Sequence, residues 1–135
     1  MLIIRKKQMA VFVEVEIEKF VDGMLVHLRK FFPRQCEAMG EPQLRETIRY
    51  GIKRAAAYGI TAERDVYKYV DLMVVFGRDF DADKQFPWAG ETLRAKKDPA
   101  RKMLSLHQAA RNYLKRTPRF GLNLPPTPAP NPTNG

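Results

Sequence analysis

Few residues of this chain have the type and spacing that catalysis or metal binding requires. His27, His107 and Cys36 are the chain's histidines and its one cysteine, and they are too far apart in sequence to form a closed zinc site. Both histidines fall on or beside apolar helical faces, which predicts core or boundary side chains that are satisfied by a hydrogen bond. The sequence has neither a Walker loop nor a GxGxxG motif, and nothing near Cys36 is typical of a nucleophile. We expect no enzymatic activity, no metal and no cofactor.

Three alternate aspartates, from Asp79 to Asp83, have the spacing that opens a calcium-binding loop. The match then fails, because Lys84 occupies the position of the required glycine and Gly90 the position of the bidentate glutamate. A solvated acidic loop, facing the basic C-terminal helix, is the interpretation that we favour.

Asp71 is the one charged residue in the apolar run 69–76. A buried carboxylate without a partner costs several kcal/mol, so this side chain needs a partner or must reach the surface. Arg45, Arg49 and Lys53, spaced four apart on the preceding helix, are candidate partners. We predict a structural ion pair between Asp71 and Arg49 or Lys53.

The elements that position these residues are predicted to be helices. Apolar residues from 8 to 32 recur at steps of three and four, which indicates one long amphipathic helix ending before Pro33. Within it, residues 13–18 alternate between apolar and acidic, which is typical of a strand. Helix is favoured because the longer stripe continues on both sides of the alternation.

Local signals mark the helices that follow. Gly59 can end one of them in the left-handed conformation, with Ile60 folding back onto it, and Thr61 can cap the next. Asp98 followed by Pro99 is a strong helix start. The predicted helices after the first cover 34–39, 42–58, 62–76, 88–95 and 99–117, with a loop at 78–87.

These patterns predict an all-α protein, a single small bundle of about five helices over residues 1–117. Six of the chain's ten prolines lie in 118–135, which predicts a disordered proline-rich tail. One cysteine excludes an intramolecular disulfide, and no apolar run approaches the length of a membrane span. The first residues do not have the order of a signal peptide, so we expect a cytoplasmic protein.

The formal charge of +9 is concentrated in one segment. Residues 94–119 contain nine basic residues and one acid, whereas residues 1–93 contain fifteen basic residues and fourteen acids. Such a segment favours an acidic protein partner or, alternatively, nucleic acid. Nucleic acid is the weaker hypothesis, because no docking motif accompanies the charges and Tyr113 is the one aromatic residue among them. The predicted partner-binding residues are Arg94, Lys96, Lys97, Arg101 and Lys102.

Residues 49–66, together with 71–73 and 76–81, have a distinctive sequence. The chain resembles, over about residues 5–114, small helical bacterial proteins encoded beside the PAAR and VgrG spike proteins of type VI secretion systems. No catalytic residue is assigned in that family. The resemblance implies an accessory of a secreted effector, either an adaptor or chaperone that binds the effector or spike protein, or an immunity protein that neutralises a cognate toxin.

Overall fold

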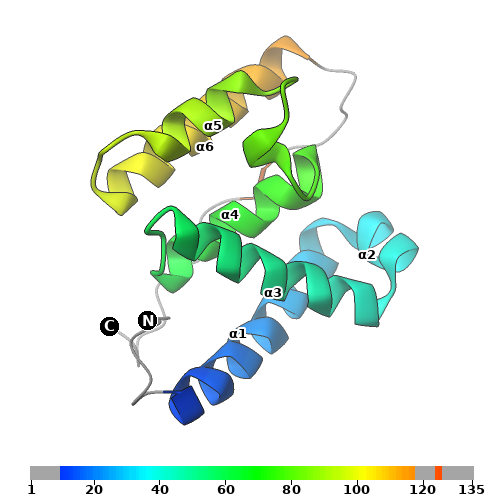
Figure 1. The fold of residues 1–135 in the computed structure, drawn as a ribbon. Helices are drawn as coiled ribbons and strands as arrows, with labels where there is room; N and C mark the ends of the chain where they lie inside the picture. Colours follow the sequence, from blue (N-terminus) through cyan, green and yellow to red (C-terminus); the bar gives the residue numbers. More distant parts are fainter. Residues whose placement is uncertain (1–9, 118–123, 126–135) are drawn as a thin grey trace.

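The computed structural model describes residues 10–117 and 124–125, with the side chains of residue 16 onwards. Within these residues the chain forms six α-helices and one short 3-10 helix and has no strand, which confirms the predicted all-α bundle (Figure 1). In chain order they are α1 (Ala10–Phe31), α2 (Pro33–Met39), α3 (Glu41–Ala57), α4 (Glu63–Phe76), η2 (Phe80–Ala82), α5 (Pro87–Arg94) and α6 (Pro99–Arg116).

The first predicted helix is confirmed as one continuous element, α1, and the strand alternative for residues 13–18 is wrong. Its buried side chains include Phe20, Met24 and Leu28, which follow one another at four-residue steps on the face toward the core. Burial of this stripe outweighs the local β-preference of the alternating segment. Residues 8 and 9, where the predicted helix begins, lie outside the described residues.

The ends of α3 and α6 follow their sequence signals. Gly59 has a φ of 83° and its N–H donates to the Ala56 carbonyl, while the Ile60 N–H donates to the Ala55 carbonyl. Ile60 is fully buried, so this is the predicted glycine stop with its hydrophobic contact. At the start of α6, the Asp98 carboxylate accepts a hydrogen bond of 3.4 Å from the Arg101 N–H.

The predicted cap of α4 is wrong. Its N-cap is Ala62, which makes no side-chain capping bond, and the helix begins at Glu63. Thr61 therefore lies one residue before the N-cap position. The acidic residues Glu63 and Asp65 in the first turn remain as favourable charges near the positive end of the helix.

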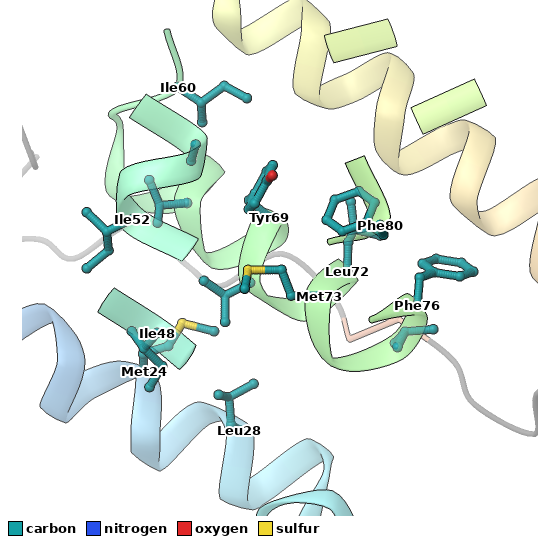
Figure 2. Packing of buried hydrophobic residues seen from close by; sticks show 14 of the residues in the cluster. Met24, Leu28, Ile48, Ile52, Ile60, Tyr69, Leu72, Met73, Phe76 and Phe80 are labelled. Carbon is teal, nitrogen blue, oxygen red and sulfur yellow. The ribbon is translucent and has the colours of Figure 1, made fainter. Parts of the chain in front are cut away.

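Helix α4 is the centre of the bundle, as its apolar second half predicts. It packs against α1, α3, α6 and η2, and its side chains Tyr69, Leu72 and Met73 lie within the core (Figure 2). Gly51 of α3 allows the close approach of α4, because a Cβ atom there would lie 2.7 Å from the Met73 Sδ. Glycine at this position sets the spacing between the two helices.

An aromatic cluster attaches α5 and α6 to the end of α4. The Phe76 ring lies 5.0 Å from that of Phe86, 5.3 Å from that of Trp88 and 5.7 Å from that of Tyr113, centroid to centroid. Phe76 ends α4, Phe86 lies in the loop before α5, Trp88 belongs to α5 and Tyr113 belongs to α6. The cluster thus fixes the α5–α6 pair that carries most of the basic segment.

The predicted disordered tail, 118–135, falls mostly outside the described residues. Leu124 and Pro125 are described, and both lie against the bundle: Leu124 packs on the hydrophobic core and Pro125 is buried. At these two positions the tail does have apolar surface to bury, contrary to the sequence interpretation.

Candidate functional site

Asp71 is hydrogen-bonded to His27, and the predicted pair with Arg49 or Lys53 is wrong. The His27 Nε2 lies 2.9 Å from one Asp71 carboxylate oxygen and 3.1 Å from the other. Asp71 projects from α4 toward α1, whereas the cations of α3 do not face it. Arg49 binds Glu18 at 2.7 Å, and Lys53 is exposed.

Arg45 and Arg49 of α3 instead bind carboxylates of α1 and of α3 itself. Arg45 lies 3.0 Å from Asp22 and 3.0 Å from Glu41, which also accepts a 2.7 Å hydrogen bond from Arg29. These ion pairs are exposed and each contributes little, but together they neutralise the charges along the α1–α3 contact. Because Arg45 and Arg49 bind these carboxylates, they do not pair with Asp71.

The His27–Asp71 pair is enclosed by the protein. The exposed fractions of the two side chains are 9% and 3%, and the rings of Tyr67 and Phe31 lie 5.1 and 5.0 Å from the His27 ring. Burial raises the pKa of the Asp71 carboxyl, and the hydrogen bond from His27 partly opposes that rise. A catalytic role for the pair would require an open cleft beside it; the enclosed geometry supports a structural role in joining α1 to α4.

Two aspartates of the 79–83 segment, Asp79 and Asp81, face α3 and not the basic C-terminal helix. Asp81 is 2% exposed, so the interpretation of a solvated loop is wrong for this residue. Its carboxylate binds the Arg54 guanidinium and accepts a 2.6 Å hydrogen bond from the Tyr58 hydroxyl. Asp79 accepts a hydrogen bond from Tyr50. Among the described residues no group of three or more histidine, cysteine or carboxylate side chains is arranged to hold a metal ion.

Cys36 and His107 are both buried. Burial raises the pKa of the Cys36 thiol, which disfavours the nucleophilic thiolate. His107 lies on the core side of α6, and burial, together with the positive charges of Arg111 and Lys68, lowers its pKa to about 4. This burial agrees with the prediction of a core or boundary position for His107, and the predicted hydrogen bond of its side chain stays a prediction.

The predicted partner-binding residues gather around the loop between α5 and α6. Two adjoining hollows of about 720 and 800 Å³ share Lys97 and Asp98 in their lining. One extends along the start of α6, and the other passes the end of α5 to the end of α3. We call the two together the basic groove; it is lined by Ala57, Tyr58, Leu93, Arg94, Ala95, Lys96, Lys97, Asp98, Arg101, Lys102, Leu104 and Ser105.

Four of the five predicted cations, Arg94, Lys96, Lys97 and Arg101, are exposed. Lys102 differs: it is 7% exposed, and its ammonium donates a 3.0 Å hydrogen bond to the backbone carbonyl of Tyr58. Its assignment as an exposed contact residue is therefore corrected. A cation at the C-terminal end of α3 satisfies a carbonyl that the helix leaves unbonded and is favoured by the helix dipole.

The exposed groove cations are not neutralised by the protein. In the part of the chain that the structure describes, Arg94, Lys96, Lys97 and Arg101 form no ion pair with a carboxylate. By contrast, five arginines of the first 78 residues each bind a carboxylate: Arg29, Arg45, Arg49, Arg54 and Arg78. Asp98, the one acid in the groove lining, caps α6. The groove is thus a localised positive surface.

Within the described residues, the fold and this surface define a small helical bundle with a basic groove. No family model matches the chain, and neither a curated protein nor a solved structure matches it. None of the helices in the described residues is long and apolar enough to cross a membrane.

Proposed function

We propose that this protein is a non-enzymatic binding protein whose basic groove recognises an acidic surface of another protein. The observation that carries the proposal is the contrast in charge pairing. Five arginines elsewhere in the bundle are bound to carboxylates, whereas the four exposed cations of the groove form no ion pair with a carboxylate among the described residues. An acidic partner would supply the missing carboxylates.

The groove suits charge-directed recognition. Cations that lie close together make the local electrostatic potential more positive. This potential accelerates the encounter with an acidic partner and fixes its orientation. Tyr58 is the one aromatic residue in the described lining, and its hydroxyl is already bonded to Asp81. Single-stranded nucleic acid is usually bound on several stacking rings, so this lining favours a protein partner.

In the type VI secretion context that the resemblance implies, such a protein acts as an adaptor or chaperone. It would hold an effector, or the PAAR or VgrG spike protein, through the groove before secretion. An immunity protein that covers an acidic toxin would use the same surface. Both roles need a protein partner with clustered carboxylates.

The first experiment is co-purification of the tagged protein with the products of the genes encoded beside its own. We expect the effector or spike protein to be retained by the wild type and released by Arg101→Glu. Arg34→Glu is the matched control, because Arg34 is exposed on α2, which packs on α1 and α3. Failure of the wild type to retain any of these proteins would refute the adaptor proposal.

A gene deletion separates the two roles. Loss of effector export from an otherwise healthy cell supports the adaptor role, whereas self-poisoning that requires the toxin gene shows an immunity protein. Nucleic-acid binding is tested by salt titration with a duplex and a single-stranded oligonucleotide. Submicromolar binding with a steep salt dependence would replace the proposed protein partner by nucleic acid.

A further inference from the structure

A large apolar side chain stands exposed within the basic groove. Leu104, on α6, is 67% exposed and lines the same hollow as Lys97, Arg101 and Ser105. It lies three residues after Arg101, so the two side chains are neighbours on the same helical face. An isolated exposed leucine has little meaning by itself. Its place inside a hollow lined by unneutralised cations is what distinguishes this one.

The other exposed large apolar residues of the described chain are in a different place. Val26 and Phe31 lie on α1, and Phe31 is covered in part by the ring of His27 and by the Lys30 ammonium, 5.3 Å from its centroid. Neither lines the groove. Leu104 is thus the one exposed large apolar side chain that the described groove presents.

Protein interfaces commonly place an apolar contact at the centre of a polar or charged rim. The rim excludes water, and the apolar contact supplies affinity that does not depend on salt. In the groove, Lys97 and Arg101 provide the charged part and Leu104 the apolar part, while the Ser105 hydroxyl provides a neutral hydrogen-bonding group.

We infer that the groove binds a protein segment in which an apolar side chain is flanked by carboxylates, with Leu104 as the apolar contact. This inference rests on the proposed function and specifies its partner. Carboxylates of the segment bind Arg101 and Lys97, and its apolar side chain covers Leu104. A segment with carboxylates alone lacks the second contact and binds more weakly.

The test measures the affinity of the full-length protein for two fluorescent peptides of equal length and charge. In one, single leucines alternate with pairs of glutamates; in the other, serines replace the leucines. We expect the leucine peptide to bind wild-type protein about fivefold to tenfold more tightly, the gain from partial burial of one or two apolar side chains. The preference should persist in high salt, where both affinities fall.

The deciding variant is Leu104→Ser, with Val26→Ser as its matched control. The two residues are exposed to 67% and 69%, so neither substitution removes a core contact. We expect Leu104→Ser to bind the two peptides within about twofold of each other and Val26→Ser to retain the wild-type preference. Unchanged thermal unfolding of both variants verifies that the fold is intact.

The outcomes separate the inference from the proposed function. If both peptides bind wild-type protein equally, or if Leu104→Ser keeps the preference, the apolar contact is refuted while charge recognition stands. If neither peptide binds, or if Arg101→Glu binds both as well as the wild type does, recognition of carboxylates by the groove is itself refuted, and this inference with it.

Discussion

His107 makes the stability of this protein sensitive to acid. The side chain is 9% exposed on α6, and its pKa is lowered from 6.5 to about 4, first by burial and then by the positive charges of Arg111 and Lys68. In the unfolded chain the imidazole regains an ordinary pKa near 6.5. Between these two pKa values, the unfolded chain therefore holds a proton that the folded protein lacks.

The direction of the effect follows from proton linkage. Since the unfolded state binds more protons in this window, lowering the pH favours unfolding. For pKa values of 6.5 and about 4, the loss in the free energy of unfolding from His107 between pH 7.5 and 5 is about 2 kcal/mol. This loss is absent at pH values above the pKa of His107 in the unfolded chain, and it is complete only below the pKa of His107 in the folded protein.

The assay is urea unfolding of the wild type and of His107→Leu at both pH values. Asp65 and Asp71, whose pKa values are raised by burial, act in the opposite direction, because the folded state takes up their protons first. Their effect is present in both proteins and cancels in the comparison. We expect the wild type to lose about 2 kcal/mol more than the variant on acidification, whatever their stabilities at pH 7.5. Equal losses in the two proteins would refute the assigned environment of His107.

Three further substitutions test the contacts that hold the bundle together. Lys102→Ala should lower the free energy of unfolding by about 1–3 kcal/mol, because the Tyr58 carbonyl loses a charged donor. Gly51→Ala should cost about 1–3 kcal/mol, because the new Cβ would overlap side chains of α4. Asp71→Ala should cost about 1–3 kcal/mol, because it leaves the His27 ring enclosed without its hydrogen-bond partner. Each is measured by chemical denaturation at neutral pH.

Each of these variants has a control, which is a substitution to alanine at an exposed position. They are Lys96→Ala for the lysine, Gln43→Ala for the glycine on α3 and Glu37→Ala for the aspartate. We expect these controls to stay within about 0.5 kcal/mol of the wild type. A test variant that matches its control would show that its contact does not contribute to stability.

Sequence reasoning succeeded where the signal is local. The stop at Gly59 and Ile60 and the start at Asp98 and Pro99 depend on a few adjacent residues, and both occur in the structure. The burial of α4 was also predictable, because a run that is apolar on nearly all sides has to lie inside the bundle.

The partners of charged side chains were less accessible to sequence reasoning, because they depend on how each helix is rotated about its axis. Asp71 was assigned to the cations of the preceding helix in sequence, yet it faces α1. One signal was available: His27 lies between Met24 and Leu28 in the buried stripe of α1. A polar residue in that stripe needs a buried partner, and Asp71 was the other unexplained polar residue.

The number of the groove cations and their proximity in sequence were enough to identify them. Their individual roles could not be identified in this way. Lys102 and Tyr58 are 44 positions apart, and no local pattern relates them. Asp81 was likewise expected in solvent. It binds Arg54 and Tyr58 only because the loop folds back onto α3, and no local pattern indicates that fold.

The hydrogen bond from Lys102 to Tyr58 has a thermodynamic consequence for any partner. The groove combines the end of α3 with the α5–α6 loop, so it exists only when the bundle is folded. A ligand that binds the folded groove and not the unfolded chain must stabilise the protein, by about 2.7 kcal/mol at one hundred times its dissociation constant. Thermal protection can therefore reveal the natural partner in a screen of acidic proteins, and a peptide of residues 94–119 would carry the same charges without the groove.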